Sequence, residues 1–156
     1  MAYQSVFKPD LFKGQTIIVT GGGSGIGRCA AHELTALGAN VAILGRTIEK
    51  LTEVQREIEE DGGQAMIQPC DIRDETMVIA AIEAVLAKYG RIDGLINNAG
   101  GQFRAPLKSI STKGFEAVVQ QPDRRLHLHA RGLYPLDASQ WRRDREHHRR
   151  HLARLA

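Results

Sequence analysis

The sequence predicts an α/β fold in residues 1–120, the N-terminal part of a Rossmann-type, doubly wound parallel sheet of about four strands. Three observations support this prediction. Short apolar runs rich in Ile and Val alternate with segments whose apolar residues recur at helical spacing. A glycine-rich turn follows the first apolar run. The expected helices are about 12–15 residues long, which suits the crossover between two parallel strands.

Each element follows from a local pattern. Residues 15–20 form an apolar run that ends at glycines, which predicts a buried strand. Ile26, Ala30, Leu34 and Leu37 then recur at helical spacing, and Gly38 ends this helix. The remaining predicted elements are a strand at 41–44, a helix over 51–58 that ends near 62–63, a weaker strand at 65–68, a helix over 78–86 that closes at 90, and a strand that begins at 95–96.

The glycine-rich turn, GGGSGIG at residues 21–27, lies between the first strand and the first helix. Glycines allow a tight turn and let the backbone approach a ligand, and the amides at the helix start favour a pyrophosphate. A second strand ends about 20 residues later, where a ribose contact is expected. The pattern predicts a dinucleotide site. The alternative is a glycine turn that only packs the helix against the strand.

The composition changes after residue 120. Residues 1–120 carry 12 Lys and Arg and 14 Asp and Glu, a net charge of −2. Residues 121–156 carry nine Arg, no Lys and four acidic residues, a net charge of +5, and they contain no Ile, Val, Phe, Met or Thr. Because strands need β-branched and aromatic residues, we expect no second domain there, only an irregular or partly helical tail.

Three motifs resemble those of the short-chain dehydrogenases/reductases. Residues 20–27 match TGxxxGxG, residues 97–100 match NNAG, and the Cys-Asp pair at 70–71 matches the acidic position after the third strand. Over residues 12–120 the chain resembles the compact type of this family. Residues 97–103, NNAGGQF, are similar to NADPH-dependent enoyl-CoA and dienoyl-CoA reductases and to bacterial citronellol-type dehydrogenases. The resemblance implies hydride transfer to or from an alcohol, a carbonyl or an enoyl-CoA type substrate.

The resemblance also implies which residues contact the cofactor. The pyrophosphate would lie against Gly21, Ser24, Gly25, Ile26 and Gly27. Asp71 would accept a hydrogen bond from the adenine amino group, with Ile72 beside it. The adenosine ribose would lie along Asn98, Ala99 and Gly100. The alternative for Asp71 is a helix N-cap or a solvated turn.

The end of the second strand favours NADP(H) over NAD(H). An NAD enzyme usually has a carboxylate there, which binds the ribose hydroxyl. This chain has Gly45 followed by Arg46. An Arg pairs with a 2′-phosphate in a forked geometry, whereas a carboxylate would repel it. The alternative is that Arg46 is a solvated loop charge.

No catalytic residue is assigned in these 156 residues. The family's chemistry needs a Tyr with a Lys four residues later, which lowers the pKa of the Tyr. None of Tyr3, Tyr89 and Tyr134 has a Lys at that spacing. We therefore expect an inactive, truncated form of low stability that lacks the family's oligomer helices. Codons allowed for the tail, read one base later, can encode NLTG and a fifth strand, AIVNII, so we hypothesise a frameshift near Gln120.

The composition limits the other function classes. No apolar run reaches the roughly 20 residues of a membrane span, and the start of the chain leads into no secretory apolar segment. Cys29 and Cys70 are expected to be small core residues of a cytoplasmic protein. We expect a small-molecule substrate and no membrane, metal or nucleic-acid partner. The alternatives are a non-catalytic dinucleotide-binding module and, through the Arg- and His-rich tail, a nucleic-acid-binding protein.

Overall fold

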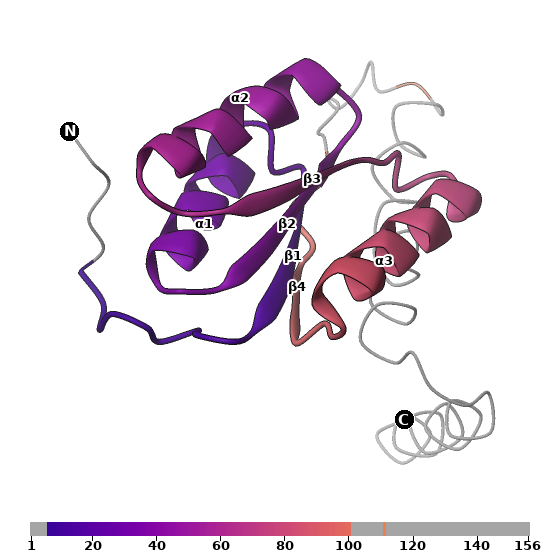
Figure 1. Ribbon diagram of the computed structural model, residues 1–156. Helices are drawn as coiled ribbons and strands as arrows, with labels where there is room; N and C mark the ends of the chain where they lie inside the picture. Colours follow the sequence, from indigo (N-terminus) through magenta and orange to yellow (C-terminus); the bar gives the residue numbers. More distant parts are fainter. Residues whose placement is uncertain (1–5, 101–110, 112–156) are drawn as a thin grey trace, which may run out of the picture.

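The computed structural model describes residues 6–100 and residue 111. A parallel sheet of four strands, in the order β3-β2-β1-β4, forms the centre of this part of the chain (Figure 1). The strands are β1 (Thr16–Thr20), β2 (Asn40–Gly45), β3 (Ala65–Pro69) and β4 (Gly94–Ile96), and the helices are α1 (Gly25–Ala36), α2 (Ile48–Glu60) and α3 (Glu75–Tyr89). The predicted α/β fold is confirmed, and the predicted elements occur in the predicted order.

The helices cover both faces of the sheet, α1 and α2 on one face and α3 on the other (Figure 1). Successive strand side chains point to opposite faces, so each strand contributes to two apolar clusters. One cluster joins β1 and β2 to α1 and α2 through Val19, Val41, Ile43, Leu34, Val54 and Ile58. The other joins them to α3 through Ile18, Ala42, Leu44, Val78, Ile82 and Val85. Burial on both faces explains the almost continuous apolar runs of β1 and β2.

The strand order creates a switch point beside β1. The chain runs outward from β1 to β2 and β3, then crosses through α3 to place β4 on the other side of β1. In open α/β sheets, ligands bind at the carboxyl ends of the strands where the strand order reverses. The topology therefore predicts a ligand site at the loops that follow β1 and β4.

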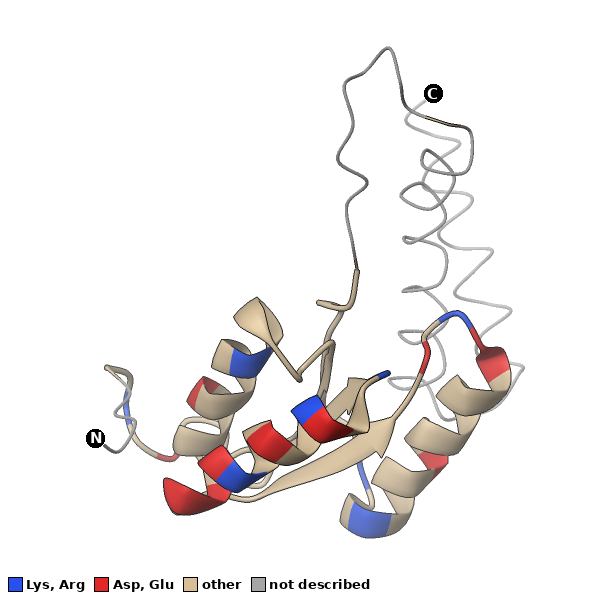
Figure 2. Ribbon diagram, turned by 90° about the horizontal axis from the view of Figure 1, so that it is seen from above, with Lys and Arg blue, Asp and Glu red and all other residues tan. Residues whose placement is uncertain are grey.

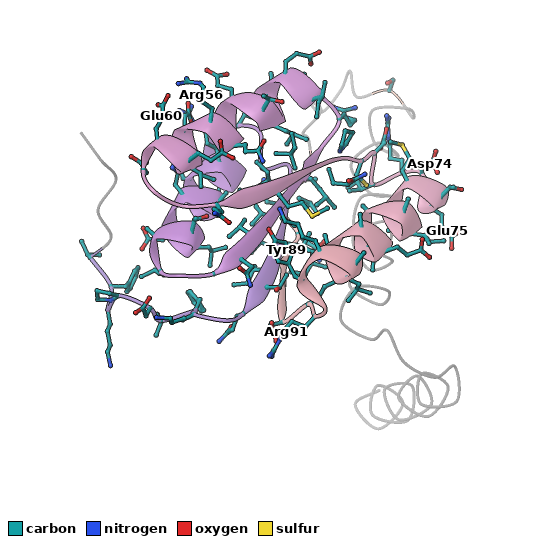
Figure 3. The ribbon with its side chains drawn as sticks, viewed as in Figure 1. Arg56, Glu60, Asp74, Glu75, Tyr89 and Arg91 are labelled. Atoms are coloured by element: carbon teal, nitrogen blue, oxygen red, sulfur yellow. The ribbon has the colours of Figure 1, made fainter. Side chains whose placement is uncertain are left out.

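Polar residues set the ends of α3. The Asp74 side chain accepts hydrogen bonds from the backbone N–H groups of Thr76 and Met77, at 2.9 and 3.3 Å, and Figure 3 shows Asp74 and Glu75 at this end. Gly90, with φ of 74°, ends the helix as predicted. The helix begins at Glu75, three residues before the predicted start at residue 78. The residues at its start, Asp74, Glu75 and Thr76, are polar and therefore lie outside the apolar pattern.

One prediction about α1 was wrong. Cys29, expected to be a small core residue, is exposed, whereas Cys70 is buried as predicted. Ile26, whose predicted role is contact with the cofactor, is 81% exposed. The buried residues of α1 are Gly27, Ala31 and Leu34. With 3.6 residues per turn, Cys29 lies on the side of the helix opposite to Gly27 and Ala31. The side chain of Cys29 therefore faces solvent.

Charge is unevenly distributed over the helices. Figure 2 shows acidic and basic positions along the outer surface of α2, whereas most of α3 is uncharged. Arg56 and Glu60 form an ion pair on that outer surface (Figure 3). Within residues 6–100, no helix has both the length and the apolarity needed to cross a bilayer. The Arg- and His-rich tail at 121–156 lies outside the described residues.

Candidate cofactor-binding site

A cleft of about 580 Å³ opens at the carboxyl ends of the four strands. The loops that follow β1, β2, β3 and β4 all contribute to its walls. The predicted cofactor residues that line it are Gly21, Ser24, Ile26, Arg46, Asp71, Ile72, Asn98, Ala99 and Gly100. The fold thus brings residues from four separate loops into one cavity. Of the predicted set, Gly25 and Gly27 do not line it.

Gly21 begins the glycine turn in a conformation that favours glycine. Its φ is +67°, and its N–H donates to the Leu44 carbonyl oxygen at 2.7 Å. A Cβ at this position would lie 3.0 Å from both the Ala99 Cα and the Asn98 Nδ2. The turn therefore runs directly beside the segment that follows β4, and a side chain would separate the two.

Gly27, in the first turn of α1, packs against the glycine turn. A Cβ on Gly27 would overlap the Gly21 carbonyl oxygen and would lie 2.5 Å from the Asn98 Nδ2. The absence of a side chain lets α1 press against the turn, so Gly27 shapes the cleft without lining it. Gly25, the first residue of α1, has a φ of +55° and open space around it.

Thr20 and Asn98 tie the two central loops together. The Thr20 hydroxyl donates to the Ile96 carbonyl oxygen at 3.1 Å and accepts from the Ala99 N–H at 2.9 Å. The Asn98 side-chain amide donates to the carbonyl oxygens of Thr20 and Gly21, at 3.0 and 3.3 Å. These bonds fix the glycine turn to the end of β4. Our site prediction omitted Thr20, although it is the first residue of the TGxxxGxG motif.

Asp71 is held by Arg73. The Arg73 Nε donates to Asp71 Oδ1 and Oδ2 at 2.8 and 2.9 Å, and the Arg73 backbone N–H donates to Oδ1 at 3.0 Å. The side-chain hydrogen bonds of Arg73 are the main reason that the pKa of Asp71 falls to about 2. Asp71 is therefore an ionised acceptor at neutral pH. The N-cap of α3 is Asp74 rather than Asp71, and Asp71 lies in the turn before it.

Three basic side chains line the cleft with this one carboxylate. They are Arg46, Lys50 and Arg73, which with Asp71 give the lining a net charge of +2 (three positive, one negative). Such a lining suits an anionic ligand. Lys50 and Arg73 were missing from the predicted site. The signal that could have identified them is a basic residue close to a strand end, as at Arg46.

Cys70 forms an apolar part of the wall. Burial, followed by the charges of Asp71 and Asp74, raises the pKa of its thiol to about 11. The thiol is thus protonated at neutral pH, and a protonated thiol is a poor nucleophile. Cys70 contributes packing to the cleft.

Four parallel strands, a glycine turn after the first and a cleft across their carboxyl ends define a Rossmann-type nucleotide-binding architecture. The family model described as short chain dehydrogenase matches residues 15–121. The chain therefore belongs to the short-chain dehydrogenase family, which is a family of oxidoreductases.

The relatives agree with the predicted branch of the family. The peroxisomal 2,4-dienoyl-CoA reductase of Danio rerio is 34% identical over 119 residues, which cover 76% of this chain and 40% of the relative. The chain spans less than half the length of this relative.

Two solved structures are also similar. A citronellol catabolism dehydrogenase of Pseudomonas aeruginosa PAO1 has a TM-score of 0.77 and 53% identity, covering 85% of this chain and 54% of its own. A metagenomic short-chain oxidoreductase in complex with NADP has a TM-score of 0.70 and 38% identity, covering 80% of this chain and 57% of its own. The resemblance inferred from NNAGGQF is confirmed.

Proposed function

We propose that this chain carries the NADP(H)-binding half of a short-chain oxidoreductase. The observation that carries the proposal is Arg46, which lines the cleft immediately after β2. In dinucleotide-binding folds, this is where a carboxylate binds the ribose of NAD and an arginine accommodates the 2′-phosphate of NADP. The metagenomic relative in complex with NADP is consistent with this choice.

The end of β2 leaves little room for a side chain at Gly45. A Cβ at Gly45 would lie 3.2 Å from the Leu51 Cδ2, and Leu51 is only 1% exposed. A side chain at the end of β2 would therefore require the buried Leu51 side chain to shift by a few tenths of an ångström. The local structure suits a glycine at position 45, followed by the positively charged Arg46.

The other residues of the cleft fit the remaining parts of the cofactor. The pyrophosphate would lie over the glycine turn, where backbone N–H groups at the start of α1 are available. The adenine amino group would donate to Asp71, beside Ile72, and the ribose would lie along the segment at 98–100. When bound, a nicotinamide cofactor supplies the hydride chemistry of the family. The residues described here bind and orient it.

We further propose that the 156 residues alone do not catalyse turnover. None of the three tyrosines in the sequence has a Lys four residues later, so the proton transfer that accompanies hydride transfer has no assigned donor. The names of the relatives favour an alcohol, carbonyl or enoyl-CoA type substrate for the complete oxidoreductase. Residues 1–120 would form the cofactor domain and 121–156 a separate tail. A cytoplasmic location is part of the same proposal.

An Arg46→Asp variant tests the cofactor assignment. We expect the 156-residue chain to bind NADPH roughly tenfold or more tightly than NADH, because one charge-assisted pair is worth at least 1.4 kcal/mol. Arg46→Asp should weaken NADPH binding and leave NADH binding equal or tighter. Arg56→Asp, on the outer surface of α2, is the matched control and should change neither dissociation constant.

The titration, followed by nicotinamide fluorescence, also separates the alternatives. With a ketone or an enoyl-CoA added as hydride acceptor, binding of NADPH without its consumption supports the non-catalytic assignment of this chain. Tighter binding of NADH by the wild-type chain, or an Arg46→Asp variant that still prefers NADPH, would overturn the NADP(H) proposal.

A further inference from the structure

Lys50 extends from the first turn of α2 beside the glycine turn. It is exposed and lines the cleft. Its Cβ lies 3.1 Å from the position that a Cβ would take on Gly23. The start of α2 therefore packs directly on the loop that follows β1. This contact places the lysine side chain at the same end of the cleft as Arg46, which precedes α2.

The four charged side chains of the cleft are not equally available to a ligand. Arg73 is occupied, because its guanidinium forms several hydrogen bonds with Asp71. Arg46 and Lys50 form no ion pair with any other residue in the described part of the chain. The charge of Arg46 acts on Asp71 at longer range. Arg46 and Lys50 are thus two cations without an ion-pair partner among the described residues, and they flank the turn between β2 and α2.

The charge of the expected ligand requires more than one cation. A phosphate monoester carries about −1.5 to −2 at pH 7, whereas a single guanidinium supplies one positive charge. Arg46 alone would leave much of that charge unpaired within the cleft. Lys50 has the length and flexibility to place an ammonium group on the same phosphate.

We propose that Lys50 is a second cation for the 2′-phosphate and therefore a specificity-determining residue of the site. This inference rests on the proposed NADP(H) function. It assigns Lys50 to the phosphate that distinguishes NADP(H) from NAD(H), rather than to the pyrophosphate that both cofactors share. The two assignments differ in which dissociation constant responds to loss of the lysine.

The test compares Lys50→Gln, Lys50→Arg and Lys8→Gln in the 156-residue chain, each titrated with NADPH and with NADH. Lys50→Gln should weaken NADPH binding roughly tenfold and change NADH binding by less than about twofold. Lys50→Arg, which keeps the charge, should retain most of the NADPH affinity. Lys8→Gln removes an exposed lysine outside the cleft and should have no effect.

The outcomes separate this inference from the proposed function. An equal loss for NADPH and NADH in Lys50→Gln would assign the lysine to the pyrophosphate and overturn the inference. An unchanged NADPH affinity would also overturn it, while a wild-type preference for NADPH would leave the Arg46 assignment standing. A wild-type chain that prefers NADH would instead refute the proposed function, whatever the variants do.

Discussion

Replacing Gly27 with alanine perturbs the contact on which the shape of the cleft depends. The added Cβ would overlap the Gly21 carbonyl oxygen and would lie 2.5 Å from the Asn98 Nδ2. Neither neighbour can move freely, because the Asn98 amide is bonded to the carbonyl oxygens of Thr20 and Gly21. Either α1 must move away from the turn or the turn must move away from β4.

The magnitude follows from three terms. Overpacking a tight contact costs about 1–3 kcal/mol. Loss of the Asn98 hydrogen bonds adds roughly 1 kcal/mol, whereas the better helix propensity of alanine in α1 returns about 1 kcal/mol. We therefore expect Gly27→Ala to lower the free energy of unfolding by about 1–3 kcal/mol. NADPH binding should weaken as well, because the glycine turn must shift.

Urea unfolding of the 156-residue chain, with NADPH titration of the same samples, measures both effects. Gly94→Ala is the matched control, since a Cβ there would lie 3.4 Å from the Ile17 Cγ1, which is ordinary contact. Its free energy of unfolding should change by less than about 1 kcal/mol. If Gly27→Ala unfolds at the wild-type urea midpoint and binds NADPH equally well, the proposed packing of α1 on the turn is wrong.

The remaining predictions concern single groups. The pKa of Asp71 is lowered to about 2 in the folded chain, against an unfolded value near 3.9, so its ionised form stabilises the fold above that range. The stability advantage of wild type over Asp71→Asn should therefore be present at pH 7 and fade as the pH falls from about 4 to about 2; a pH-independent difference in urea unfolding would contradict this. Asp93 accepts a hydrogen bond from the N–H of the fully buried Thr16 at 2.8 Å, so Asp93→Ala should cost about 1–3 kcal/mol of unfolding free energy, with an unchanged urea midpoint as the refuting result. Sequencing the gene through the codon for Gln120 should reveal a second open frame that encodes a further strand, and an early stop in that frame would refute the frameshift hypothesis.

Most of the fold could be predicted because its strands are buried on both faces. Such strands read as continuous Ile- and Val-rich runs, and the amphipathic segments between them read as helices. The starts of α2 and α3 were harder to place. Asp74 caps α3 through its side chain, whereas Thr47, the N-cap of α2, makes no side-chain cap hydrogen bond. Cys29 was misplaced because a small apolar side chain was counted as buried, whereas the buried residues of α1 are Gly27, Ala31 and Leu34.

The site was predictable where a motif fixes the local backbone. The glycine turn, Arg46, Asp71 and Asn98 follow from short patterns at strand ends, and the structure places them around one cleft. Lys50 and Arg73 were missed although both follow strand ends closely. Arg73 pairs with Asp71, only two residues away. The contact of Lys50 with the Gly23 position joins segments that are distant in sequence, so it required the three-dimensional structure.

The most direct test of this account is an NMR titration of the 156-residue chain with 2′,5′-ADP, which carries the 2′-phosphate, with 5′-AMP as the comparison. We predict that 2′,5′-ADP shifts the amide signals of the glycine turn, Arg46, Lys50 and Asp71, and that the shifts at Arg46 and Lys50 are largely absent with 5′-AMP. Equal responses to the two ligands, or responses confined to residues outside the cleft, would contradict the assignment of this site to NADP(H).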